Sequence, residues 1–370
     1  MTGGARSARN GSRRAGRLIQ GTQTRAAAPP GRGANDMQAR ENLPQAAARA
    51  AVAPAEDRQR WRQHIADYSL VAIFAVMFAA MSLTVDHFFS IDNMLGLALS
   101  ISQIGMVACT MMFCLASRDF DLSIGSTVAF AGVMCAMVLN ATDNTFVAIA
   151  AAVAAGAVIG FVNGAVIAYL RINALITTLA TMEIVRGLGF IVSKGQAVGV
   201  SSETFIALGG LSFLGVSLPI WVTLVCFVVF GVLLNQTVYG RNTLAIGGNP
   251  EASRLAGINV ERTRVYIFLI QGAVTALAGV ILASRITSGQ PNAAQGFELN
   301  VISACVLGGV SLAGGRASIS GVVIGVLIMG TVENVMNLLN IDAFYQYLVR
   351  GAILLAAVLL DQLKNRGARD

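Results

Sequence analysis

The sequence predicts an all-α, polytopic membrane protein with about ten transmembrane helices, and three observations support that fold class. Hydrophobic residues make up 55% of the 370 positions and charged residues only 12%, whereas a typical soluble domain is about 25% charged. The mean hydropathy is +0.67. The apolar residues are gathered in stretches of about 20, which is the length that a helix needs to cross the hydrocarbon core.

Ten such stretches follow one another along the chain, separated by polar loops. The eighth is short and rich in glycine, so we expect a tilted or re-entrant helix there. The predicted limits of the ten helices are about 68–86, 93–116, 122–140, 145–170, 173–193, 216–235, 265–284, 299–314, 318–339 and 343–361.

The membrane domain, 67–362, is flanked by two polar tails. The first, 1–66, is basic and rich in Ala, Arg, Gly and Pro, and we expect it to be disordered. The second is short, 363–370. Twelve of the 26 Lys and Arg residues lie in the first tail. With both tails placed in the cytoplasm, the connecting loops on that side carry most of the remaining basic residues, as the positive-inside rule requires. The net charge of +7 therefore indicates orientation, and no nucleic-acid partner is expected.

Several kinds of chemistry find no support in the sequence. The five cysteines lie in apolar runs without a C-x-x-C spacing, and the two histidines lie in different segments, so neither disulfides nor a metal site is expected. No Ser–His or paired-Asp constellation indicates an intramembrane enzyme. The only lysines, Lys194 and Lys364, follow Ser193 and Leu363, so the chain lacks the G-K-[ST] of a phosphate-binding loop. We expect no cofactor bound by this chain.

A weak internal repeat relates the two halves of the chain. "DLSIGS" from Asp121 resembles "ELNVIS" from Glu298, "GAVIGFVNG" from Gly156 resembles "GVVIGVLIMG" from Gly321, and "INAL" and "VRG" have counterparts in the same order. Five crossings separate the copies, so they should run in opposite senses, as in inverted-repeat transporters. Chance similarity between Gly- and Val-rich helices is the alternative. Asp121 and Glu298 each begin a predicted helix, where a carboxylate can cap free N–H groups.

The longest polar loop, 236–264, contains a short predicted helix with a start signal and a stop signal. It begins with a capping Asn, a proline and a carboxylate, continues with an apolar stripe, and ends at a glycine suited to a left-handed stop. A helix of about two turns is not stable alone in water, so we expect it to dock on a partner. Its residues are Asn249, Pro250, Glu251, Ala252, Leu255, Ala256 and Gly257.

This loop resembles the cytoplasmic coupling loop of ABC importer permeases through the pattern E-A-x-x-x-A-G-I, from Glu251 to Ile258. The resemblance extends from about Tyr68 to Leu360 and leaves the first tail unmatched. The further blocks are similar to the monosaccharide branch of that family. They are "FCLASRDFDLSIGS", "INALITTLATMEIVRGLGFIVSKGQAVGV", "GRNTLAIGGNPEASRLAGI", "ILASRITSGQP", "ISACVLGGVSLAGG" and "GTVENVMNLLNI".

The resemblance implies an ABC importer permease fold in the bacterial inner membrane, with both termini cytoplasmic. It implies a permease homodimer, a separate ATPase subunit that binds ATP and Mg, and a periplasmic sugar-binding protein. The implied cargo is L-arabinose, with ribose, xylose or galactose as alternatives. An ion-coupled secondary carrier is the alternative of another class, in which Glu183 or Glu333 would be the titrating group.

Polar residues inside the spans are candidates for the translocation path, or for hydrogen bonds that hold helices together. Glu183 and Arg186 lie three residues apart on one helix face and could neutralise each other. Arg350, the counterpart of Arg186 in the repeat, could pair with Glu333. The candidates are Asn163, Glu183, Arg186, Gln271, Glu333, Asn334, Asn337 and Arg350.

Overall fold

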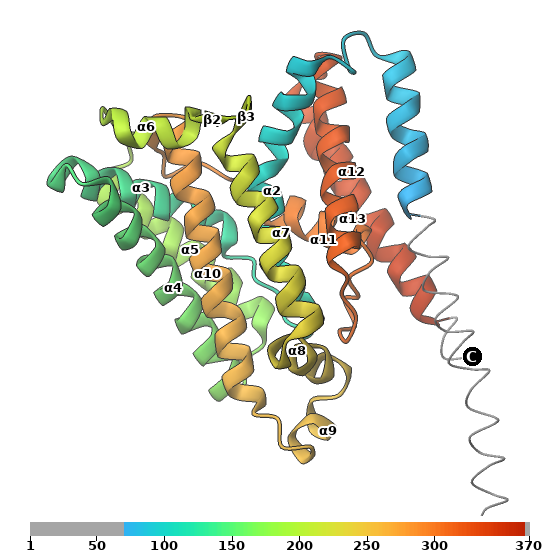
Figure 1. Ribbon diagram of the computed structural model, residues 1–370. Coiled ribbons are helices and arrows are strands. Elements are labelled where there is room, and N and C mark those ends of the chain that lie inside the picture. The colour runs from blue at the N-terminus through green and yellow to red at the C-terminus, as the bar shows by residue number, and fades with distance from the viewer. Residues whose placement is uncertain (1–69, 367–370) are drawn as a thin grey trace, which may run out of the picture. The chain divides into compact units, whose positions relative to one another are not determined.

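The computed structural model describes residues 70–366, which form a helical bundle with very little sheet (Figure 1). The predicted tail, 1–66, and the last four residues, 367–370, lie outside the described part. Seven described helices are long and apolar enough to cross a membrane. They are α2 (Ile91–Ala116), α3 (Ile124–Thr142), α4 (Thr145–Tyr169), α5 (Ala174–Ser193), α7 (Leu218–Gln236), α10 (Val260–Arg285) and α12 (Ile319–Leu338).

The other three predicted spans are present as shorter apolar helices, so ten complete crossings stay a prediction. One is Leu70–Thr84 at the start of the described chain, and another is α11 (Phe297–Leu307). The third is the apolar part, Ala343–Leu359, of α13 (Ala343–Arg366). Because α13 continues to Arg366, the predicted second tail is helical over its first four residues.

The remaining elements lie at the two ends of the bundle. At one end of the bundle, α6 (Glu203–Gly210) lies beside two small antiparallel sheets; we call this the α6 end (Figure 1). At the opposite end, α8 and α9 follow α7; we call this the α9 end (Figure 1). The first sheet pairs β1 with β4, and the second pairs β2 with β3. The bounds are β1 Val198–Gly199, β2 Ser212–Phe213, β3 Val216–Ser217, β4 Ser288–Gly289, α8 Val238–Gly248 and α9 Pro250–Leu255.

The repeated segments run in opposite senses, as the sequence predicts. α3 ends at the α6 end, where the Asn140 side-chain amide donates to Gly199 O at 2.9 Å. α11 instead runs toward the α9 end, where the loop after it bonds to the end of α2 through Gly315 N–H and Ala116 O at 2.9 Å. Consequently α4 and α12 are antiparallel, and so are α5 and α13 (Figure 1).

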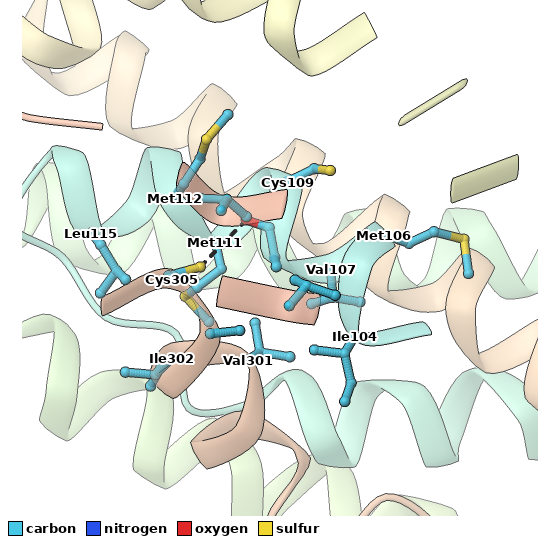
Figure 2. Close-up of a cluster of buried hydrophobic side chains, with 14 of the residues drawn as sticks. Ile104, Met106, Val107, Cys109, Met111, Met112, Leu115, Val301, Ile302 and Cys305 are labelled. Carbon is cyan, nitrogen blue, oxygen red and sulfur yellow. Dashed lines mark hydrogen bonds between the residues drawn. The ribbon is translucent and has the colours of Figure 1, made fainter. Parts of the chain in front are cut away.

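The core is centred on α2, and its largest buried cluster surrounds the second half of that helix. Met106, Met111 and Met112 have no exposed surface. Side chains of α11, including Val301 and Cys305, pack against this face of α2 (Figure 2). The most apolar window of α2 is 72% buried, compared with 22% for α4 and for α5. α2 is therefore the central helix, while α4 and α5 present most of their surface to lipid or to a partner.

α4 and α10 approach each other closely through glycines of the repeated motif. A methyl group added at Gly156 would lie 2.5 Å from Gly272 O, and one added at Gly164 would lie 2.8 Å from Val265 Cα. Gly160, one turn from each on α4, faces Phe268 O of α10. Glycines four residues apart allow helix backbones to pack this closely in membranes.

Two predicted helix limits are wrong for identifiable reasons. The eighth predicted helix, 299–314, ends at Leu307, because Gly309, Gly314 and Gly315 all have positive φ values between +77° and +80°. The glycine-rich stretch is thus a loop. The helix predicted to begin at 265 begins at Val260, because the Asn259 side chain caps it by accepting a hydrogen bond from Arg262 N–H at 2.9 Å.

Candidate functional site

The segment after α8 forms the short helix α9 that the sequence predicts. Asn249 has extended backbone dihedrals, and its side-chain oxygen accepts hydrogen bonds from Glu251 N–H at 3.0 Å and Ala252 N–H at 3.1 Å. Pro250 occupies the first helical position. The chain then leaves α9 through Gly257, which has a φ of +84°. The cap and the stop are therefore both present.

The apolar stripe of α9 points away from the rest of the chain. Leu255 is 92% exposed, and Ala252 and Ala256 are exposed as well. Only Ser253 of this helix is buried, and its hydroxyl donates to Asn249 O at 2.9 Å. α9 is thus ordered by its caps and lies at the end of the bundle (Figure 1). Its apolar surface is uncovered.

A cavity of about 600 Å³ opens beside α9. Inside it, Arg264 pairs with Asp119 at 3.1 Å, and the hydroxyl of Ser117 donates to the same carboxylate oxygen at 3.3 Å. Burial raises the pKa of Asp119 to about 6, although Arg264 and Ser117 act in the opposite direction. The lining residues are Arg118, Asp119, Phe120, Ile167, Ala168, Arg171, Ile172, Asn173, Ala174, Leu175, Pro250, Glu251, Arg254 and Arg264.

Arg118 connects three segments at this end of the molecule. Its Nε–H donates to Ala313 O at 2.6 Å, and its Nη2–H donates to Gly248 O at 2.7 Å. The guanidinium thus joins the loop after α2 to the end of α8 and to the glycine-rich loop after α11. Nothing local in the sequence indicates these distant carbonyl partners of Arg118.

Within residues 70–366, Glu183 and Arg186 form no direct ion pair, although the charge of Glu183 acts on the guanidinium of Arg186. Arg186 turns toward the segment between α10 and α11, where its Nη1–H donates to Pro291 O at 2.9 Å and Ala293 O at 2.7 Å. Glu183 is exposed and is absent from the ion pairs of residues 70–366. A single chain therefore presents a carboxylate on the membrane-spanning part of α5.

The predicted pair between Glu333 and Arg350 is present, with a nitrogen–oxygen distance of 3.1 Å. Both side chains are largely buried, at 17% and 24% exposed. The Asn300 amide also donates to Glu333 at 3.0 Å. These contacts join α11, α12 and α13, and charge pairing with hydrogen bonds is what allows such groups inside a bilayer.

Two of the predicted path amides lie in contacts between helices. Asn163 is fully buried and connects α4 to its neighbours through Ser123 Oγ at 3.0 Å and Thr181 Oγ1 at 2.6 Å. Asn334 exchanges two hydrogen bonds with Asn93 of α2, at 2.8 and 3.0 Å.

Gln271 is also fully buried, on α10, and its Nε2 lies 3.5 Å from Thr275 Oγ1. Among the predicted amides, Asn337 is the exposed one, and it accepts a hydrogen bond from Gln346 at 2.9 Å. A solute outside the bundle could reach Asn337 but not the buried amides.

The carboxylates at the start of the repeats lie close to helix N-termini. Asp121 is buried and accepts hydrogen bonds from Ser123 N–H at 2.9 Å and Ser123 Oγ–H at 2.6 Å. It therefore organises the residue that precedes α3. Glu298 lies in the first turn of α11, next to Gly125 of α3. The beginnings of α3 and α11 thus meet inside the bundle.

The chain is similar to known membrane transport proteins. A family model described as "Branched-chain amino acid transport system / permease component" matches residues 93–358. The L-arabinose transport system permease protein AraH of Escherichia coli (strain K12) is 58% identical over 302 residues, which cover 82% of this chain and 92% of that protein. The L-arabinose ABC transporter permease protein AraH of Azospirillum brasilense is 55% identical over 320 residues, covering 86% and 94%.

A third relative carries a different sugar in its name. The ribose import permease protein RbsC of Escherichia coli (strain K12) is 37% identical over 301 residues, which cover 80% of this chain and 94% of that protein. No solved structure matches this chain.

Proposed function

This chain belongs to the branched-chain amino acid transport system permease family, and from that membership we propose that it is the membrane subunit of an ABC importer for L-arabinose. The observation that carries the proposal is the 58% identity to an L-arabinose permease over 82% of the chain. The identity to the ribose permease is 37% over a similar length, which favours arabinose over ribose.

The distribution of basic residues supports placing the α9 end in the cytoplasm. The α6 end carries Lys194 and Arg285 in its loops and helix ends. The α9 end carries many more cations, which the positive-inside rule assigns to the cytoplasmic side. They are Arg118, Arg171, Arg241, Arg254, Arg262, Arg264 and Arg316.

On that side a separate ATPase subunit, with its ATP and Mg, docks on α9. The exposed stripe around Leu255 supports this assignment, because a capped helix with an uncovered apolar face gains stability from a partner surface. The sequence contains no G-K-[ST] loop, so ATP hydrolysis is assigned to the partner. A periplasmic sugar-binding protein delivers the sugar at the α6 end.

A second copy of this chain covers the face of α5 that carries Glu183. Glu183 is exposed there next to Ile184, which is 63% exposed. Lipid alone would leave the carboxylate of Glu183 without a polar partner, at a cost of several kcal/mol. A homodimer with a water-filled path between the copies removes that cost.

Reconstituted vesicles test this function. The chain is assembled with its ATPase subunit and binding protein, and uptake of labelled L-arabinose is measured with unlabelled ribose, xylose or galactose as competitors. We expect uptake to require ATP on the α9 side and both partners. Uptake by the chain alone, driven by a proton or sodium gradient, would instead establish an ion-coupled carrier.

Variants in α9 test the docking surface. Glu251→Lys and Leu255→Asp should weaken co-purification of the ATPase and lower uptake without unfolding the permease. Val238→Asp is the matched control, because Val238 is an exposed apolar residue of α8 at the same end. Equal effects of Leu255→Asp and Val238→Asp would argue against a specific role for α9.

A further inference from the structure

The segment between α10 and α11, residues 286–296, enters the bundle without forming a helix. α10 ends at the α6 end, where Ser284 Oγ accepts a hydrogen bond from Gly209 N–H at 2.7 Å. After β4 the segment descends beside α3. A methyl group added at Gly289 would lie 2.6 Å from Val133 Cα, and one added at Gly125 would lie 2.6 Å from Ala294 O.

These contacts place the segment at membrane depth. Val133 and Gly125 lie 9 and 17 residues before Thr142, the end of α3. At 1.5 Å per residue they are about 14 and about 26 Å along the helix axis from that end. The guanidinium of Arg186, in the middle part of α5, contacts the same segment. Residues 289–294 thus lie within the span of α3.

Non-helical backbone at this depth is tolerated where it is buried in protein or lines a water-filled cavity. Part of this backbone is satisfied by protein, since Pro291 O and Ala293 O accept from Arg186 and Gly289 pairs with Val198. Two side chains of this segment have no hydrogen-bond partner in the described part of the protein. Asn292 and Gln295 are exposed, and neither forms a hydrogen bond with any described residue.

Lipid cannot satisfy these two amides, and they match one class of solute. Each amide offers two donors and an acceptor, and each sugar hydroxyl is both a donor and an acceptor. The neighbouring charges of Arg186 and of Glu183 and Glu298 have opposite signs, so the surroundings do not select an ion of one sign. A neutral, polyhydroxylated solute fits this chemistry better than a charged one.

We infer that Asn292 and Gln295 line the narrow part of the translocation path and donate and accept hydrogen bonds with the hydroxyl groups of the passing sugar. Arg186 is a positioning residue that holds the segment 286–296 against α5. This inference rests on the proposed function, and it adds two substrate-contacting residues and their ligand class, a neutral monosaccharide.

Thiol accessibility tests the placement without requiring transport. All five native cysteines are buried, so a thiol introduced by Asn292→Cys or Gln295→Cys can be followed alone with a charged, membrane-impermeant maleimide. Both variants should react in vesicles. Val228→Cys is the matched control, because Val228 is 66% exposed on α7 among apolar neighbours and should face lipid. The placement would be overturned if the thiols introduced at 292 and 295 were as unreactive as the one introduced at 228.

Uptake in the complete reconstituted transporter tests the sugar contact. Asn292→Ala with Gln295→Ala should lower L-arabinose uptake about thirtyfold, as expected for the loss of two hydrogen bonds worth about 1 kcal/mol each at 1.4 kcal/mol per factor of ten, while ATPase binding is unchanged. Gln236→Ala, at an exposed amide at the end of α7, is the control. Unchanged uptake in the double variant, with the wild type active, would overturn the sugar contact.

A wild type that takes up no arabinose would instead refute the proposed function, and the labelling result would still decide the placement. For Arg186, the readout is the labelling rate of Asn292→Cys. It should change with Arg186→Met and return toward its starting value with Arg186→Lys, because the lysine can still donate to the loop carbonyls. An equal rate in all three backgrounds would refute the positioning role.

Discussion

Replacement of Asp121 by Asn should change the pH dependence of folding by a predictable amount. Burial raises the pKa of this carboxyl from its ordinary value of 3.8 to about 6, against the opposing effect of its hydrogen bonds from Ser123. The folded chain therefore binds this proton more tightly than the unfolded chain does. Its contribution to stability is present below about pH 4 and is lost as the pH rises through about 6.

The size of the effect follows from the shift. A difference of about 2 units corresponds to about 3 kcal/mol at 1.36 kcal/mol per unit. Asp121→Asn removes the titration and keeps an oxygen that can accept from Ser123. The free energy of unfolding of the variant minus that of the wild type should therefore rise by about 3 kcal/mol between pH 3 and pH 7.

The measurement is unfolding in mixed micelles, followed by tryptophan fluorescence at several pH values. Ser126→Ala is the control, because it changes a neutral, buried side chain in the first turn of α3 that donates to Ser123 O. Its difference from the wild type should be independent of pH. If the free-energy difference between Asp121→Asn and the wild type is also independent of pH, or falls with rising pH, burial is not the dominant effect on the pKa of Asp121.

Two further changes probe the packing and the cap. Gly160→Ala places a methyl group against Phe268 O and should destabilise the fold by about 1–3 kcal/mol, whereas Gly187→Ala on α5 meets no atom within 4 Å and should change it little. Unfolding midpoints that match for the two variants would contradict close packing of α4 and α10. Asn249→Ala removes the cap of α9, worth about 1 kcal/mol, and should weaken ATPase binding about fivefold in a titration of the two subunits. Unaltered affinity would mean that α9 is held by other contacts.

The elements that could be predicted from sequence are those governed by local physical rules. The spans were located because bilayer thickness sets the length of an apolar helix. α9 was located because Asn249, Pro250 and Gly257 each favour one position at a helix end. The opposite senses of the repeats followed from counting crossings. None of these inferences needs knowledge of which helices touch.

The misses in the candidate site concern contacts between distant parts of the chain. Spacing on α5 suggested that Arg186 would bond to Glu183, but the carbonyls of Pro291 and Ala293 lie more than a hundred residues away in sequence. Asn292 and Gln295 were overlooked because they lie between predicted spans, where polar residues are ordinary. The available signal was the loop's position next to a short, glycine-rich span, which indicates a chain that enters the membrane and turns.

The position of Arg118 explains how a force on α9 could reach the membrane-embedded path. Its guanidinium holds Gly248, which directly precedes the cap of α9, and Ala313, in the loop between α11 and α12. Arg118 itself lies in the loop between α2 and α3. A displacement of α9 by a docked ATPase would therefore act at once on the loops that adjoin α3 and α11.

α3 and α11 are the helices whose N-termini meet inside the bundle, next to the segment 286–296. Because α2 is 72% buried in the core, it resists such a displacement, and the less buried α5 is freer to shift. We therefore expect α5 to move relative to α2. Arg186 of α5 holds the segment that carries Asn292 and Gln295, so this segment should move with α5. Under the proposed function, docking of the ATPase on α9 would then be connected to opening of the path through two loops and the guanidinium of Arg118, without any need for the core around α2 to repack.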